Sequence, residues 1–218
     1  MNRRDFITRS GAAGLALAGF PMARAWAEEG RKKRILYFTK CSGFVHSVVK
    51  RKGEELSHSE KVLTDLGAAN GFEVVCSKDG SLFTPGYLAG FDAFLFMTTG
   101  DLTKPGTDGE PPMTPAGKQA LLDAVRGGKG FLGAHTALDT FHSRGDRFAP
   151  AGDRLDPYLA MVGAEFIKHG PQQKAKMAAV DERFPGFDGL GGGFEMMDEW
   201  YTFRDFQPDM HVLLVQET

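Results

Sequence analysis

The chain has 218 residues, a formal net charge of −2 at pH 7 and 42% hydrophobic residues, which is typical of a globular protein. Acidic and basic residues are nearly balanced and no basic stripe carries interleaved aromatics, so nucleic acid is not expected as a partner. Beyond the N-terminal segment, no run stays apolar over the roughly 20 residues that a membrane-spanning helix requires, so no span is expected in the mature chain. An oxidising compartment would permit a disulfide between Cys41 and Cys76, but we expect two buried thiols.

The N-terminus has the pattern of an export signal. An arginine pair at positions 3 and 4 precedes a short, weakly hydrophobic stretch at residues 11–20, and Ala-Trp-Ala at residues 25–27 supplies a cleavage site. The paired arginines indicate the twin-arginine route. We therefore predict a twin-arginine signal peptide over residues 1–27 and one periplasmic or secreted domain over residues 28–218. The alternative is a basic, disordered N-terminus.

Short β-rich segments alternate with helical segments in the first two thirds of the chain. Strands are predicted at residues 34–39, 72–76, 93–97 and 130–134. The strand at 130–134 contains the apolar run Gly-Phe-Leu and is expected to be buried. This order of strands and helices predicts an α/β fold with a mostly parallel sheet and helices on both faces.

Two helices connect these strands. The first is predicted at residues 59–69 and ends at Asn70-Gly71, with a buried face formed by Val62, Leu63 and Leu66. The second opens at Thr114-Pro115, where threonine caps the helix and proline takes its first position. Its predicted buried face consists of Ala120, Leu121, Ala124 and Val125.

The last third of the chain gives weaker signals. We predict a short helix at residues 156–162, an outer strand at residues 174–180 and a final strand at residues 211–215. A core strand that runs straight into the terminus is unusual.

Residues 133–142, GAHTALDTFH, place two histidines, an aspartate and two threonines directly after a predicted strand. Ligands of open α/β sheets bind at the carboxyl ends of the strands, so this segment predicts a ligand site. The alternative is structural: Asp139 would cap a helix that starts at Thr140, and the polar groups would satisfy one another.

His135 occupies the tight turn where α/β hydrolases and glutamine amidotransferases hold a nucleophilic serine or cysteine. Both cysteines lie elsewhere, so cysteine-dependent amidotransferase chemistry is not expected. Metal or acid–base chemistry is the remaining option, because imidazole and carboxylate groups suit zinc and related metals. The candidates after strands or in loops are His46, His135, His142, His169 and Glu199, although their spacing matches no compact metal motif. Each of these residues could instead have a purely structural role, and a structural role is what we expect for His58 and His211.

Four segments resemble the ThuA-like (trehalose utilisation) family of the class I glutamine amidotransferase-like superfamily. They are SGFVH at 42–46, FMTTGDL at 96–102, GAHTALDTFH at 133–142 and DEWY at 198–201, in the order of the family. The resemblance implies a flavodoxin-like fold and a pocket lined by His46, Thr99, His135, Asp139, His142, His169 and Glu199. Members usually lack the amidotransferase cysteine. They also usually continue with a glycine-rich strand, a Gly-His turn and a final helix, so we expect this chain to be truncated at its C-terminus.

The resemblance implies a role in catabolism of a disaccharide or 3-keto sugar, by hydrolysis, isomerisation or elimination. We expect a small carbohydrate as the ligand and a divalent metal such as zinc as the candidate cofactor. The expected catalytic residues are His135, Glu199 and Asp139; the substrate-binding residues are Thr99, Thr140, Trp200 and Tyr201; the metal ligands are His46, His142 and His169. The alternatives are a non-catalytic sugar-binding or accessory protein, in which Trp200 or Tyr201 stacks on the sugar, and a relic of the fold that serves a partner.

Overall fold

The computed structural model describes residues 31–187 and 189–217. The predicted signal peptide at residues 1–27 lies outside these residues. All elements described below belong to the unit that spans Lys33–Thr218.

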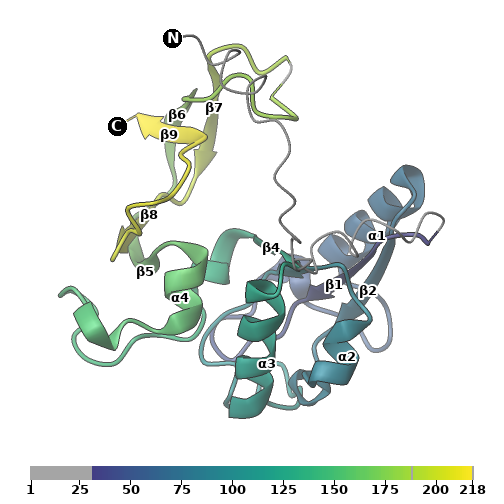
Figure 1. Cartoon of the computed structure of the whole chain (residues 1–218). Coiled ribbons are helices and arrows are strands. Elements are labelled where there is room, and N and C mark those ends of the chain that lie inside the picture. Colours follow the sequence, from purple (N-terminus) through teal and green to yellow (C-terminus); the bar gives the residue numbers. More distant parts are fainter. Residues whose placement is uncertain (1–30, 188, 218) are drawn as a thin grey trace, which may run out of the picture. The chain divides into compact units, whose positions relative to one another are not determined.

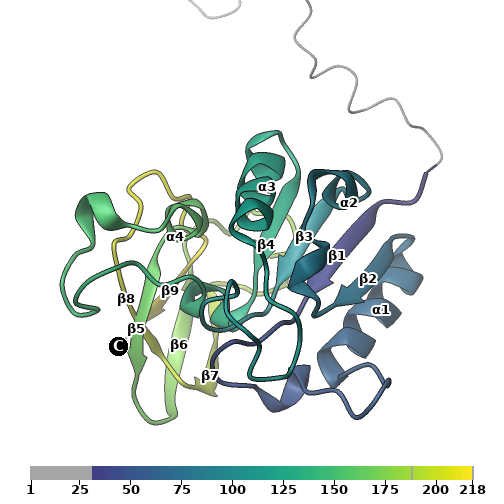
Figure 2. The same cartoon turned by 90° about the horizontal axis from the view of Figure 1, so that it is seen from below.

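Four parallel strands form the central sheet, in the order β2-β1-β3-β4 (Figure 2). Their bounds are β1 Arg34–Phe38, β2 Glu73–Ser77, β3 Ala93–Phe96 and β4 Gly130–Gly133. The strand order reverses between β1 and β3, which is where open α/β sheets form a ligand crevice. The predicted α/β fold and mostly parallel sheet are confirmed.

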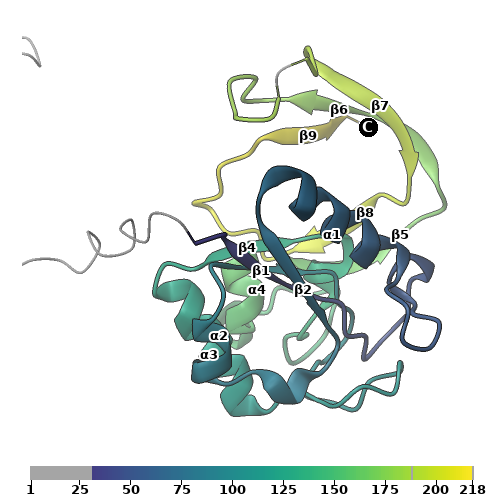
Figure 3. The same ribbon diagram turned by 90° about the vertical axis from the view of Figure 1, so that its right-hand side faces the viewer.

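Helices cover both faces of this sheet. Figure 3 shows α1 on one face and α2 and α3 on the other. The helices are α1 His58–Asn70, α2 Pro85–Ala89, α3 Pro115–Arg126 and α4 Pro157–Val162, with 3-10 turns η2 Ser47–Val49, η3 Gly80–Leu82, η4 His135–Asp139 and η5 Gly152–Arg154. Thr114 caps α3 by accepting a hydrogen bond from the backbone of Gly117, as its sequence predicts.

The buried face of α3 follows the prediction, whereas that of α1 does not. Leu121 is fully buried, and Ala120, Ala124 and Val125 pack against the core. In α1, Val62 and Leu66 are 53% and 50% exposed. The helix instead approaches the sheet through Gly67, where a Cβ atom would lie 2.8 Å from the carbonyl oxygen of Phe72, and through the buried carboxylate of Glu60. The predicted apolar face of α1 is therefore wrong for Val62 and Leu66, whereas Leu63 is half-buried; a small residue and a polar network make the main contact.

The prediction of a buried fourth strand is also wrong. Strand β4 is an edge of the four-stranded sheet, and Leu132 is 60% exposed. The apolar run in the sequence of β4 therefore indicates that these residues favour a strand, but it does not indicate that both faces of the strand are buried.

The last third of the chain forms antiparallel pairs. Strand β5 (Glu165–His169) pairs with β8 (Tyr201–Arg204), and β6 (Gln173–Ala179) lies between β7 (Gly193–Asp198) and β9 (Leu214–Glu217) (Figure 1). The strand predicted at 174–180 is thus central to its small sheet, not outer. The final strand begins at Leu214, three residues later than predicted.

The core lies between the parallel sheet and α2, α3 and α4. Phe38, Phe83 and Phe96 form one group of rings, with Phe38 and Phe83 centroids 4.6 Å apart, and Tyr158 joins it from α4. Both cysteines are free thiols; Cys41 is buried and Cys76 is half-buried. Within residues 31–187 and 189–217, no helix is long and apolar enough to cross a bilayer.

Candidate functional site

Side chains from three loops and one strand pair meet beyond the carboxyl end of the parallel sheet. We call His46, His135, His169, Glu199 and Tyr201 the histidine cluster. His46 follows β1, His135 follows β4, and the other three come from the β5–β8 pair and the turn before β8. Sequence separation between the first and last member exceeds half of the chain, so only the fold brings them together.

His135 lies at the centre of the cluster in an unusual backbone conformation. Its φ is +48°, in the left-handed region that residues with a side chain rarely adopt. A non-glycine residue held there directly after a strand is typical of a functional turn, such as the one that presents the nucleophile in α/β hydrolases. The imidazole packs edge-on against His46, with ring centroids 4.6 Å apart.

Tyr201 provides the opposite wall of the cluster. Its hydroxyl lies 3.4 Å from Nε2 of His135. Its ring packs on Phe166, at 4.4 Å between centroids, and is stacked with His169 at 5.6 Å. These contacts hold the phenol against the imidazole. His169 also approaches Glu199, because its Nε2 lies 3.7 Å from a carboxylate oxygen of that residue.

The surroundings of His135 and His46 favour the uncharged imidazole. Desolvation lowers the pKa of His135, and the nearby carboxylates of Asp198 and Glu199 only partly oppose this effect. Desolvation, together with the neighbouring His135, also lowers the pKa of His46. Burial raises the pKa of Tyr201 to about 12, so its phenol stays protonated. In such a pair, the neutral imidazole can accept a proton and the protonated phenol can donate one.

His142 belongs to a different group, formed with Asp139, Glu165 and Arg204. Its Nε2 lies 3.2 Å from Asp139 and its Nδ1 3.5 Å from Glu165. The hydrogen bond with Asp139 raises the pKa of His142 above its ordinary value. Glu165 is buried and pairs with the buried Arg204 at 3.0 Å. The pKa values of His142 and His135 are thus shifted in opposite directions.

Several predicted site residues are occupied by contacts within the protein. Asp139 caps no helix, since it is the last residue of η4 and Thr140 is extended; the capping alternative is wrong. Thr140 is fully buried and bonded to Thr98, and Thr99 donates to the carbonyl of Phe44 at 2.8 Å. Because the hydroxyls of Thr140 and Thr99 are already hydrogen-bonded within the protein, a structural role is favoured for both residues. The indole of Trp200 donates to the carbonyl of Gln173.

The proposed metal ligands do not converge. His142 faces Asp139 and Glu165, whereas His46 packs on His135 and His169 faces Glu199. Among the described residues, no group of three or more His, Cys, Asp or Glu side chains is arranged to hold a metal ion. The residues present therefore do not fit the expected zinc site.

A pocket of about 560 Å³ opens beside His142. Phe141, with a φ of +54°, forms part of its wall, and the ammonium of Lys118 lies 4.1 Å from the centre of that ring. Lys118 also pairs with Asp156 at 2.5 Å. Further lining residues are Asp101, Thr103, Ser143, Arg144, Asp153, Arg154, Leu155 and Pro157. The pocket is polar and large enough for a small ligand.

Sequence reasoning missed the groups that support the site. Phe44, whose ring lies 4.8 Å from that of His46, could have been suggested by its position in the same loop. Glu165 and Arg204 gave no local signal, because their burial depends on the pairing of β5 with β8.

Two solved structures have the same fold. A protein described as ThuA-like from Bacteroides uniformis aligns with a TM-score of 0.59 and 19% identity, covering 88% of this chain and 70% of that one. A ThuA-like protein from Parabacteroides merdae aligns with a TM-score of 0.56 and 14% identity, covering 85% and 68%. No curated protein matches the sequence.

The family comparison agrees with the fold. Residues 34–218 match the sequence family described as trehalose utilisation. This range contains every strand and helix described above. The chain therefore belongs to the ThuA (trehalose utilisation) family, whose role lies in carbohydrate metabolism.

Proposed function

We propose that the chain is an enzyme of carbohydrate catabolism that acts on a disaccharide or 3-keto sugar, with His135 as its general base. The observation that carries this proposal is the imidazole of His135, held at a positive φ at the end of β4, 3.4 Å from the hydroxyl of Tyr201. Its lowered pKa leaves it neutral near pH 7, as a general base requires. Membership of the ThuA family is the reason for proposing a carbohydrate as the substrate.

The pair suits removal of a proton from the carbon next to a ketone. Nε2 of His135 accepts that proton, the C–H electron pair forms the enolate, and the phenol of Tyr201 donates a hydrogen bond to the enolate oxygen. If the carbon that lost the proton carries a hydroxyl group, the proton of that hydroxyl passes to the enolate oxygen, and the imidazolium protonates the former carbonyl carbon. The ketone thereby moves by one carbon, which is an isomerisation. If a leaving group stands on the next carbon, its departure with the electron pair completes an elimination. Glu199 and His169 accept and donate hydrogen bonds to sugar hydroxyls.

The test is turnover of a 3-keto disaccharide by the wild type and by His135→Ala, followed by NMR in D₂O. Loss of a catalytic base typically costs 10²–10⁴-fold in rate, so turnover and solvent deuterium incorporation should both fall by about that factor. His58→Ala is the matched control, because His58 begins α1 and is solvent-exposed, outside the histidine cluster. Wild-type rates in His135→Ala, with the fold intact by circular dichroism, would refute the assignment.

The second candidate is a non-catalytic sugar-binding protein. The observation in its favour is the aromatic surface formed by Phe166, Tyr201 and His169, which resembles a stacking platform for a sugar ring. Calorimetric binding of a disaccharide without turnover of any keto sugar would favour this candidate over the enzyme.

Export is part of the proposal and rests on the arginine pair and the A-x-A sequence before residue 28. We expect the protein in the periplasmic fraction, and an Arg3→Lys/Arg4→Lys variant should accumulate in the cytoplasm. Equal export of both proteins would contradict the twin-arginine route.

A further inference from the structure

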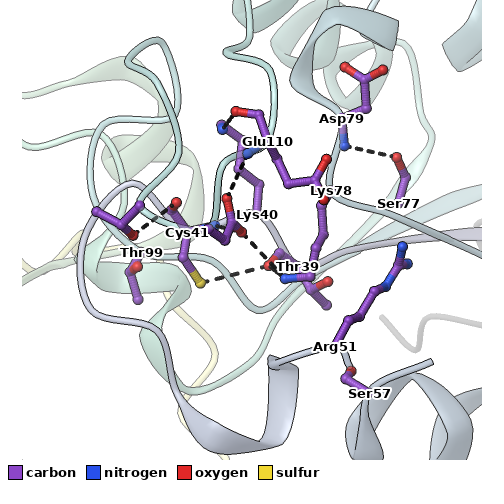
Figure 4. Close-up of polar contacts among 12 residues, drawn as sticks. Thr39, Lys40, Cys41, Arg51, Ser57, Ser77, Lys78, Asp79, Thr99 and Glu110 are labelled. Atoms are coloured by element: carbon purple, nitrogen blue, oxygen red, sulfur yellow. Dashed lines mark hydrogen bonds and ion pairs between the residues drawn. The ribbon is translucent and has the colours of Figure 1, made fainter. Parts of the chain in front are cut away.

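A second polar pocket, of about 470 Å³, lies at the carboxyl ends of β1 and β2 and is separate from the pocket beside His142. Its lining residues are Val45, Lys50, Arg51, Gly53, Glu54, Lys78, Thr107, Asp108 and Glu110. Figure 4 shows Lys78 and Glu110 gathered near Thr39, with Arg51 on the neighbouring segment. Its volume falls in the range of small-molecule sites.

Two of its cations are fixed before any ligand arrives. Lys78, which is only 4% exposed, donates to the carbonyl of Thr39 at 2.7 Å and lies 3.4 Å from Asp108. Arg51 is held by the fully buried carboxylate of Glu60 through contacts of 2.8 and 2.9 Å. Each cation is thus already paired with a carboxylate, yet each has more N–H donors than these contacts use.

The loop at residues 107–110, which forms part of the pocket lining, is also held by hydrogen bonds. Asp108 accepts hydrogen bonds from the backbone of Cys41 and of Glu110, at 2.9 and 3.2 Å. The buried ammonium of Lys40 donates to the carbonyl of Glu110 at 2.7 Å, as Figure 4 shows. Thr107 donates to the carbonyl of Gly43 at 2.6 Å. A lining anchored at so many points loses little conformational freedom on binding.

Two acceptors in the lining remain available. Within the described part of the chain, the carboxylates of Glu54 and Glu110 accept no hydrogen bond, and Glu110 interacts with Lys40 and Arg51 only through its charge. The pocket therefore offers fixed donors beside free acceptors, without an excess of either charge. Such a lining does not select an anion or a cation; it matches hydroxyl groups, each of which donates and accepts one or more hydrogen bonds.

We propose that this pocket binds one ring of a neutral, polyhydroxylated ligand, and that it is the subsite for the second sugar of a disaccharide. The proposal rests on the function proposed above, because the two sites share one loop. Val45 lines the pocket, and the next residue, His46, packs against His135. A disaccharide would place one ring against the histidine cluster and the other in this pocket.

The test is calorimetric titration of trehalose and of glucose into the full-length mature protein and into a Glu54→Gln/Glu110→Gln variant. We expect trehalose to bind the wild type more tightly than glucose does. In the variant the Kd for trehalose should rise about tenfold, since hydrogen bonds to a charged acceptor are stronger than those to a neutral amide. Glu55→Gln is the matched control, as its exposed side chain is not part of the lining.

The outcomes separate the two proposals. If trehalose binds the wild type and the double variant equally, or binds neither, the subsite is refuted. Binding of inorganic phosphate in place of trehalose would refute it as well, by showing an anion site. If trehalose binding depends on Glu54 and Glu110 but no keto sugar is turned over, the subsite holds and the proposed enzyme fails. A Lys78→Met variant, checked for folding, should also weaken trehalose binding.

Discussion

The buried ion pair between Glu165 and Arg204 gives a sharp test of how the histidine cluster is supported. The two residues are direct cross-strand partners in β5 and β8, with side chains 2% and 7% exposed. Arg204 also donates to the backbone carbonyls of Asp146 and Ala149. In Arg204→Met, the buried carboxylate of Glu165 loses its guanidinium partner and two carbonyls lose a donor. Breaking a buried pair in this way costs about 3–5 kcal/mol, a large fraction of the ~5–15 kcal/mol that stabilises a typical domain.

The assay is urea denaturation followed by tryptophan fluorescence, with three variants compared with the wild type. Lys61→Met is the control, because Lys61 and Asp65 form an exposed pair, 68% and 65% accessible, whose loss should cost under about 1 kcal/mol. Glu165→Gln/Arg204→Met should be less destabilised than Arg204→Met, since the double variant buries no unpaired charge. If Arg204→Met loses no more stability than Lys61→Met, the buried pair does not hold β5 to β8 and the reasoning fails.

Three further predictions follow from the ionisable groups. Although burial raises the pKa of Glu165, hydrogen bonds from Ser143 and Arg204 lower it below its ordinary 4.5. The stability that this carboxylate contributes is therefore complete above pH 4.5 and is lost as pH falls through the lower pKa of the folded protein. Denaturation midpoints measured between pH 3 and 6 test this, and no such loss in the wild type relative to Glu165→Gln would contradict it. The pKa of His135 is lowered, so the acidic limb of kcat/KM for a 3-keto sugar should have its midpoint below pH 6.5, with activity lost as pH falls through it; a midpoint above 6.5 would exclude a neutral His135 as the base. Tyr201→Phe keeps the ring contacts with Phe166 and His169 but removes the hydroxyl, so kcat should fall about 10²-fold with KM little changed, whereas an equal rise in KM would indicate a binding role.

Much of the parallel half of the fold could be predicted from the sequence, because its signals are local. Thr114-Pro115 marks the start of α3, and the stop at Gly71 follows α1 with a φ of +78°. The strand segments lie within a few residues of their predicted bounds. The alternation of these elements is enough to predict a parallel sheet, since parallel strands need a crossover between them.

The candidate site was predictable only in part. The sequence predicts His46, His135, His169 and Glu199 as site residues because each follows a strand or lies in a loop, and the fold brings these four together with Tyr201. The surroundings of the other expected site residues could not be predicted. Thr140, which looks like a polar loop residue, is fully buried, and His142 turns toward Asp139 and Glu165.

The sequence by itself determined the family, the α/β alternation, the Thr114 cap of α3 and the loops that carry the polar residues. These features depend on short-range periodicity and on residue types at fixed positions. Only the tertiary structure decided that Val62 and Leu66 face solvent, that β4 is an edge strand and that β5 pairs with β8. Burial and pairing depend on partners far along the chain, so the pKa values of His135 and His142, which share one ordinary value, shift in opposite directions only in the folded protein.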